Sequence, residues 1–355
     1  MEPSVNPFVA LLRCTSCRFT IFYALPFFAA LAGAGQASVG WGMFSLAYWW
    51  LHSTGTEAAN RLSDRHEDAI NRPERTAMCA QLGWGRLRAA LVAAWAGVAV
   101  LDVFLVVARP SVALAVLLVL SAASALGYSY GPRLARHRAV APLLLTFHFG
   151  GTFITGWVVA HPQTDDTASG GFLREVGPFV VVSCATLLAL GGSKDITDVS
   201  GDEAIGYRSG WIALVRRHGA WLTWALVMST FALTAAFVVA GLLPERWLWI
   251  VVLLPLAVRL RQCLWTAATP LERAVTRELF YHYWIAYLCV AVLLYAPGPA
   301  TALAVLVAAL LWLIASNTLH WGTGVDRTFV RTVIRLGRRA TRPPQLPDHR
   351  REGVA

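Results

Sequence analysis

Long apolar stretches alternate with short polar connections along almost the whole chain. Ten stretches read as membrane-crossing helices, covering residues 18–35, 39–59, 87–108, 111–130, 139–160, 177–193, 219–242, 246–265, 279–296 and 299–318. A helix needs roughly 20 apolar residues to span a bilayer, and backbone polar groups in lipid must be satisfied within the helix. The sequence lacks the alternating ten-residue segments of a membrane β-barrel. The pattern therefore predicts an all-α, polytopic bundle of nine to ten spans around a central cavity.

Basic residues are distributed unevenly between the connections. The chain has 30 basic and 20 acidic residues, which give a net charge of +10. Of the basic residues, Arg109, Arg174 and Arg246 lie in the loops of one side and the remaining 27 on the other. Because basic loops stay in the cytoplasm, we expect both termini on the cytoplasmic side of a bacterial-type cytoplasmic membrane. We expect the basic loops to lie against the lipid bilayer, and we expect no nucleic acid as a partner.

The two ends of the chain differ in character from its middle. We divide it into a cytoplasmic segment (residues 1–17), a transmembrane domain (18–320) and a basic tail (321–355). Within the tail, residues 326–339 interleave apolar side chains with arginines, as interfacial amphipathic helices do. From Pro343 onward the tail is polar and proline-containing, which predicts disorder.

An acidic cluster follows the second apolar stretch. Asn60, Asp64 and Asp68 are spaced i, i+4, i+8, so a helix continuing from that span would carry them on one face. Pro73 predicts the end of this helix close by. His52 lies two turns before Asn60 on the same face and is expected to point into the cavity.

A second acidic cluster follows the sixth apolar stretch. Asp195, Asp198 and Asp202 are spaced i, i+3, i+7, again one helical face, and Lys194 before them is the only lysine of the chain. By the topology above, both clusters lie at cytoplasmic ends of spans, so we expect them to face each other across the cavity.

The two clusters together indicate a metal–diphosphate site. Oxygen-bearing side chains suit Mg²⁺, which is usually held by one or two carboxylates together with water and substrate phosphates. Lysine and arginine bind phosphate directly. One acidic run alone would be an ordinary hydrated helix end, but two runs on one side of an apolar enclosure predict a lipid substrate with a diphosphate head.

Three segments resemble the UbiA superfamily of intramembrane prenyltransferases. NRLSDRHEDAINRPER (60–75) is similar to the family motif NDxxDxxxD followed by NRP, and KDITDVSGDEAIGYRSGWIALVRRHG (194–219) is similar to KDxxDxxGDxxxGxxSxxxxxG. GYSYGPRLARHR (127–138) resembles the tyrosine-containing basic loop after the fourth span. The three segments occur in the family's order, and the resemblance covers roughly residues 15–300.

The resemblance implies a bundle of commonly nine helices around a cavity open to lipid, with Mg²⁺ ions holding an isoprenyl diphosphate. Metal ligands carried over from the motifs are Asn60, Asp64, Asp68, Asp195, Asp198 and Asp202, and among them Asp64, Asp68, Asp198 and Asp202 are implied to be catalytic. Diphosphate-binding residues are Lys194, Arg72, Arg133 and Arg136. Tyr128 and His52 are expected to contact substrate.

One departure from the family pattern is prominent. The family's usual aspartate after the asparagine is Arg61 here. A cation at this position changes the charge of the first cluster, and we expect it to alter metal occupancy or to add a phosphate contact.

Several functions share this chemistry. The leading prediction is transfer of an isoprenyl group to an aromatic or quinone-like acceptor. The alternatives are a terpene cyclase of the same superfamily, which needs no acceptor, and transfer to a non-aromatic acceptor such as a lipid or sugar phosphate. A transporter that couples cations through the acidic pairs is a fourth reading, but the sequence shows no inverted repeat of the kind that transporters use.

The acidic clusters yield a direct prediction. Asp64→Ala and Asp198→Ala should each abolish release of diphosphate from an isoprenyl diphosphate, since each removes a ligand or charge from one half of the site. Diphosphate release by the purified variants measures this. Full activity in both variants would contradict the metal assignment.

Overall fold

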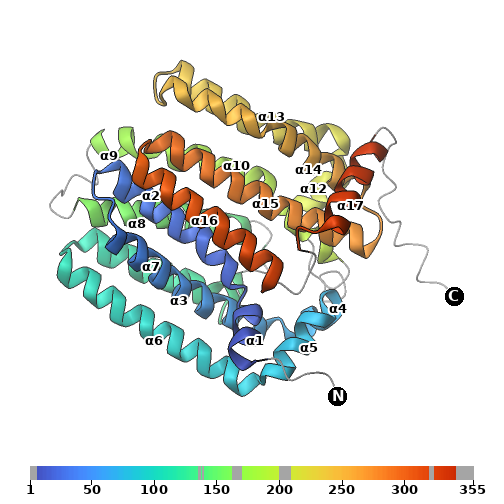
Figure 1. Ribbon diagram of the computed structural model, residues 1–355, viewed down its shortest axis with the longest axis horizontal. Coiled ribbons are helices and arrows are strands. Elements are labelled where there is room, and N and C mark those ends of the chain that lie inside the picture. Colours follow the sequence, from blue (N-terminus) through green and yellow to red (C-terminus); the bar gives the residue numbers. More distant parts are fainter. Residues whose placement is uncertain are drawn as a thin grey trace.

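The computed structural model describes residues 6–134, 137, 140–161, 170–199, 209–319 and 324–340, and all regular structure within these ranges is helical (Figure 1). The elements are α1 (Pro7–Cys14), η1 (Cys17–Phe19), α2 (Thr20–Gly33), α3 (Val39–Ser63), α4 (Arg65–Asn71), α5 (Pro73–Leu82), α6 (Trp84–Ala108), α7 (Val112–Ser129), α8 (Val140–Ala160), α9 (Gly170–Glu175), α10 (Gly177–Leu190), η4 (Gly191–Thr197), α12 (Gly210–His218), α13 (Ala220–Val239), η5 (Glu245–Leu253), α14 (Leu254–Thr266), α15 (Pro270–Tyr295), α16 (Pro299–Thr318) and α17 (Arg327–Arg339). The prediction of an all-α bundle is confirmed.

Eight helical segments of the described chain are long and apolar enough to cross a membrane: α6, α7, α8, α10 with η4, α13, η5 with α14, α15 and α16. α1 and the segment η1–α2 meet the same criteria only as a pair bent by 55°, which gives a count of nine. The remaining expected span, residues 39–59, corresponds to α3, which is 25 residues long and does not meet these criteria. α3 is less apolar than these helices because several of its buried side chains are polar.

Two glycines allow close contact between α3 and the outer helix α6. A Cβ atom at Gly55 of α3 would lie 2.7 Å from Nε1 of Trp95 on α6, and one at Gly97 would lie 2.9 Å from Leu51. Without hydrophobic attraction between helices in lipid, such close packing of backbones is what stabilises a membrane bundle. α3 therefore contacts α6 closely at two positions, which lie about one turn apart.

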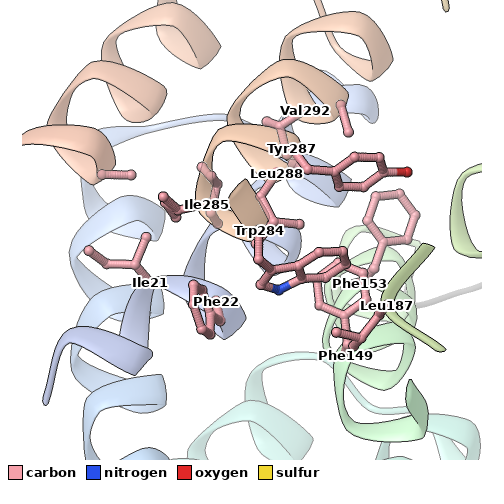
Figure 2. Packing of buried hydrophobic residues seen from close by; sticks show 14 of the residues in the cluster. Ile21, Phe22, Phe149, Phe153, Leu187, Trp284, Ile285, Tyr287, Leu288 and Val292 are labelled. Carbon is pink, nitrogen blue, oxygen red and sulfur yellow. The ribbon is translucent and has the colours of Figure 1, made fainter. Parts of the chain in front are cut away.

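Aromatic side chains of α15 fill the space between α2, α8 and α10 (Figure 2). Trp284 stacks on Tyr287 with ring centroids 5.2 Å apart, and Phe149 of α8 meets the edge of Trp284 at 5.0 Å. Such offset and edge contacts add to the energy of burial. They place α15 as the central helix of this half of the bundle.

The outer faces of the helices remain apolar. On α6, Val100, Val103, Phe104 and Val107 are all more than half exposed. A soluble protein rarely leaves such a contiguous patch in water, whereas lipid tails solvate it. The bundle therefore presents apolar side chains both inward and outward.

The short polar helices gather at one end of the bundle, where α4, α5, α12 and α17 lie (Figure 1). Helix α17 confirms the amphipathic helix expected over residues 326–339: it buries Phe329 and Leu336. Its arginines reach Glu272 at the start of α15, with Arg339 Nη1 2.9 Å from a carboxylate oxygen. Its position at a membrane surface stays a prediction.

The contact between α2 and α8 gives a stability prediction. A Cβ atom at Gly156 of α8 would collide with the backbone oxygen of Phe27, which cannot move aside, whereas one at Gly151 meets nothing within 4 Å. Gly156→Ala should therefore destabilise the protein by roughly 1–3 kcal/mol, the usual cost of overpacking. Thermal unfolding in detergent measures this, with Gly151→Ala as the matched control. Equal melting temperatures of the two variants would contradict this packing.

Candidate active site

A cavity of about 820 Å³ opens where α3 and η4 end. Charged and amide side chains line its mouth: Asn60, Asp64, Asp68, Arg72, Lys194, Asp195, Asp198 and Arg277. The ends of α10 and α12 and the start of α13 supply an apolar side wall, and α2, α3, α8 and α15 line the deeper part. The structure thus brings the two acidic clusters to one cavity, as their spacing predicted.

The first cluster lies on a bent helical segment rather than on one straight helix. α3 ends at Ser63, and α4 begins at Arg65. Asp64 at the bend has φ −99° and ψ 20°, yet the backbone bonds from Asp64 N to Asn60 O (2.9 Å) and from Asp68 N to Asp64 O (2.8 Å) persist. The prediction of one continuous helix through Asn60, Asp64 and Asp68 is therefore wrong, because the helix is bent at Asp64. α4 ends at Asn71, as the following proline predicted.

The second cluster lies on a 3-10 helix, not on the α-helix that the spacing suggested. Asp195 belongs to η4 and Asp198 caps it. In a 3-10 helix residues three apart lie directly above each other, so these two carboxylates still share a face. Asp202 lies outside the described residues.

An ion pair joins the two clusters. Arg72 Nη2 and Nε lie 2.7 Å and 3.1 Å from Oδ1 of Asp198. Burial by itself would raise the pKa of Asp198, but the charges of Arg72, Arg277 and Lys194 outweigh it and hold that pKa below its usual range. Asp198 is therefore ionised at neutral pH.

The other carboxylates also have cationic neighbours. Asp68 pairs with Arg75 and lies 3.6 Å from Arg61 Nη1. Asp195 accepts from Lys194 Nζ at 2.8 Å, and from the Ser209 hydroxyl at 2.7 Å. Alternating charge thus lines the whole mouth of the cavity.

The Arg61 side chain lies against acidic residues of the first cluster and its neighbourhood. The side chain is buried, pairs with Glu57, and donates from Nε to the Cys14 carbonyl oxygen at 3.3 Å. Together with the 3.6 Å approach to Asp68, this places a cation beside the last acid of the motif.

The donor set suits Mg²⁺ in chemistry, because it consists of carboxylate and amide oxygens. Among the described residues, no three His, Cys, Asp or Glu side chains converge on one point. Magnesium sites commonly use only one or two carboxylates and take further ligands from phosphates and water. The residues that could hold the ion are Asn60 and Asp64 on one side and Asp195 and Asp198 on the other.

Arg277 of α15 is a site residue that sequence reasoning missed. It is 5% exposed, lines the cavity, and donates from Nη1 to the Thr197 hydroxyl at 3.3 Å, next to Asp198. Glu278, fully buried, lies 3.3 Å from Arg277 and 2.7 Å from Arg18. The available signal was an Arg-Glu pair at the start of a span, where ionisable residues suggest function.

The remaining predicted residues divide into three groups. Tyr128 and His52 line the cavity. Arg133 is exposed on the turn after α7, with φ 48°, and does not line the cavity. Arg136 lies outside the described residues, so the roles of the basic loop stay predictions.

The fold is thus a bundle of membrane-spanning helices around a cavity lined by both acidic and basic side chains. The family model described as the UbiA prenyltransferase family matches residues 20–274. The chain belongs to this family and is an integral membrane protein.

Comparison with solved structures finds the same fold in a digeranylgeranylglyceryl phosphate synthase. The two chains are 13% identical and superpose with a TM-score of 0.54, covering 82% of this chain and 99% of the other. No curated protein matches the sequence. The likeness supports the helix arrangement, while the family assignment rests on the sequence motifs.

Arg277 gives a prediction for substrate binding. Arg277→Gln should raise the KM for an isoprenyl diphosphate by roughly tenfold or more, because a hydrogen bond to a charged group contributes about 1.5–3 kcal/mol. Steady-state kinetics measures this. Arg273→Gln, one turn earlier and outside the cavity, is the control. An unchanged KM in Arg277→Gln would show that this cation does not contact the diphosphate.

Proposed function

We propose that the protein is a Mg²⁺-dependent prenyltransferase that ionises an isoprenyl diphosphate and transfers the prenyl group to an aromatic or quinone-like acceptor. The supporting observation is the meeting, in one cavity, of both acidic motifs, three buried or half-buried cations and an apolar wall. A diphosphate head and a hydrocarbon tail need these two surroundings side by side.

The cations at the mouth bind the diphosphate and stabilise its growing charge. Arg72, Lys194 and Arg277 approach from three different elements, and all line the cavity. As the C–O bond breaks, its electron pair leaves with the diphosphate, and fixed positive charges in an apolar site favour that step. Bound Mg²⁺ would supply further charge neutralisation on the phosphate oxygens, with the aspartates of both motifs as its ligands.

Aromatic side chains of α2 and α15, in the cavity beyond the charged mouth, stabilise the allylic cation. Phe22, Tyr23, Tyr281 and Trp284 line the cavity, and ring faces attract a desolvated cation. They also exclude water, which would otherwise capture the cation. A ring carbon of the acceptor then forms the new C–C bond, and the ring loses a proton.

The apolar side wall suits the prenyl chain. Leu188, Leu214 and Trp221 line the cavity and are also 44%, 53% and 61% exposed on the outer surface of the bundle. Such positions lie between the cavity and the lipid. We infer that the chain enters and leaves there, with the charged mouth on the cytoplasmic side.

A terpene cyclase is the competing function. The aromatic lining of the cavity favours it, because such rings can stabilise an allylic cation that no acceptor captures. The solved neighbour is named for a glyceryl phosphate product, so a phosphate-bearing acceptor is a further outcome to be tested. The three functions share the ionisation step and differ in what captures the cation.

Incubation with and without acceptor separates these functions. Purified protein with Mg²⁺ and geranyl, farnesyl or geranylgeranyl diphosphate should produce little product until a phenol is added, and chelation of Mg²⁺ should stop turnover. Product analysis by mass spectrometry measures this. Cyclic hydrocarbon or alcohol formed without acceptor would establish the cyclase instead, and prenylation of glyceryl phosphate but not of phenols would establish the third function.

A further inference from the structure

Two histidines face each other in the deeper part of the cavity. His52 of α3 and His148 of α8 both line it, with ring centroids 6.2 Å apart. His52 is 3% exposed. It precedes Asn60 by eight residues, so it lies roughly 12 Å further along the helix axis from the charged mouth.

The hydrogen bonds of the two rings differ. His148 Nδ1 lies 3.0 Å from the Leu144 carbonyl oxygen, which only accepts, and Nε2 lies 3.3 Å from the Ser124 hydroxyl. Both nitrogens of His148 are therefore occupied. His52 Nε2 lies 3.1 Å from the Ser121 hydroxyl, but within the described part of the chain no hydrogen bond reaches its Nδ1.

The ring of His52 is held in place by its neighbours. Trp49 and Trp95 pack against it with centroids 5.1 Å and 5.0 Å away, Trp95 edge-on. Gly55 allows this approach, since any larger residue would meet the Trp95 indole. A ring nitrogen that has no protein partner among the described residues, on a side chain that is only 3% exposed, calls for a ligand or a water molecule as its partner.

A hydrocarbon chain is a poor ligand for this position. Packing a prenyl chain against Nδ1 of His52 would leave the polar atom buried and unsatisfied. The side wall at Leu214, Trp221 and Leu222 offers the chain a mainly apolar surface, with His218 as its polar member. The deeper pocket is thus left for a reactant that carries a polar group.

We propose that Nδ1 of His52 binds the hydroxyl or carbonyl group of the aromatic acceptor, with the ring of that acceptor beside His148. When the Ser121 hydroxyl donates to Nε2, Nδ1 carries the ring proton; when it accepts from Nε2, Nδ1 presents a lone pair. One site therefore serves a phenol or hydroquinone hydroxyl and a quinone carbonyl alike. This inference rests on the proposed transferase function and identifies the class of its second substrate.

Binding measurements test the site without requiring turnover. Full-length protein in lipid nanodiscs, with Mg²⁺ and inorganic pyrophosphate, is titrated calorimetrically with 4-hydroxybenzoate, hydroquinone and 1,4-dihydroxynaphthalene, and with the dimethyl ether of the last. The wild type should bind at least one of the hydroxylated probes saturably, and 1,4-dihydroxynaphthalene more tightly than its ether.

Substitutions assign the contact to His52. His52→Phe should weaken binding of the hydroxylated probe roughly tenfold, the effect of leaving a buried hydroxyl unpaired, without altering binding of the ether. His52→Asn, which keeps a polar atom near the position of Nδ1, should recover part of the affinity. His161→Phe, at the far end of α8 and outside the cavity, is the matched control.

Saturable binding of none of the hydroxylated probes by the wild type would overturn the proposal, as would wild-type affinity in His52→Phe. The comparison of 1,4-dihydroxynaphthalene with its ether uses unaltered protein, so equal affinity of the two also overturns it, even if a variant fails to fold. Diphosphate release from geranylgeranyl diphosphate by the same preparation reports on the proposed function separately. If diphosphate is released but no phenol binds, the acceptor site at His52 is wrong and the proposed ionisation step stands.

Discussion

The pairing of charges inside an apolar bundle is the constraint on which the site depends. A charge removed from water must find an opposite charge or hydrogen-bond partners, and Arg72 meets this need for Asp198 across the gap between two helical segments. The same pair keeps both motifs at one cavity. A diphosphate entering the mouth would compete with the aspartates for these cations, while a divalent ion would take over the aspartates.

Rigid packing behind the site keeps these groups in place. α3 carries the first acidic motif at its end and His52 two turns earlier, and Gly55 and Gly97 hold it closely against α6. On the opposite side, α15 contributes both Arg277 at the mouth and Trp284 in the aromatic core. These two helices therefore each contribute side chains both to the mouth and to the deeper part of the cavity.

The chain departs from the common family pattern at Arg61, and the charge of this side chain is compensated by its acidic neighbours. Arg61, where the pattern has an aspartate, is buried between Glu57 and Asp68. It lowers the negative charge of the first motif and gives Asp68 a second cationic neighbour beside Arg75. Among the described side chains of the first motif, Asn60 and Asp64 are thus the two for which the structure shows no ion pair with Arg61 or Arg75.

Apolar run lengths determined the helical class and the span positions, because hydrophobic length is a local property of the chain. Motif spacing and topology also predicted that the side chains of the two acidic clusters would share one cavity, which five of the six line. Tertiary structure decided the rest. The bend at Asp64 and the 3-10 geometry at Asp195 depend on what the backbone packs against. Arg277 joins the site only because α15 lies beside η4, some 80 residues away in sequence. That no described residue bonds to Nδ1 of His52 is likewise visible only once its neighbours on other helices are known.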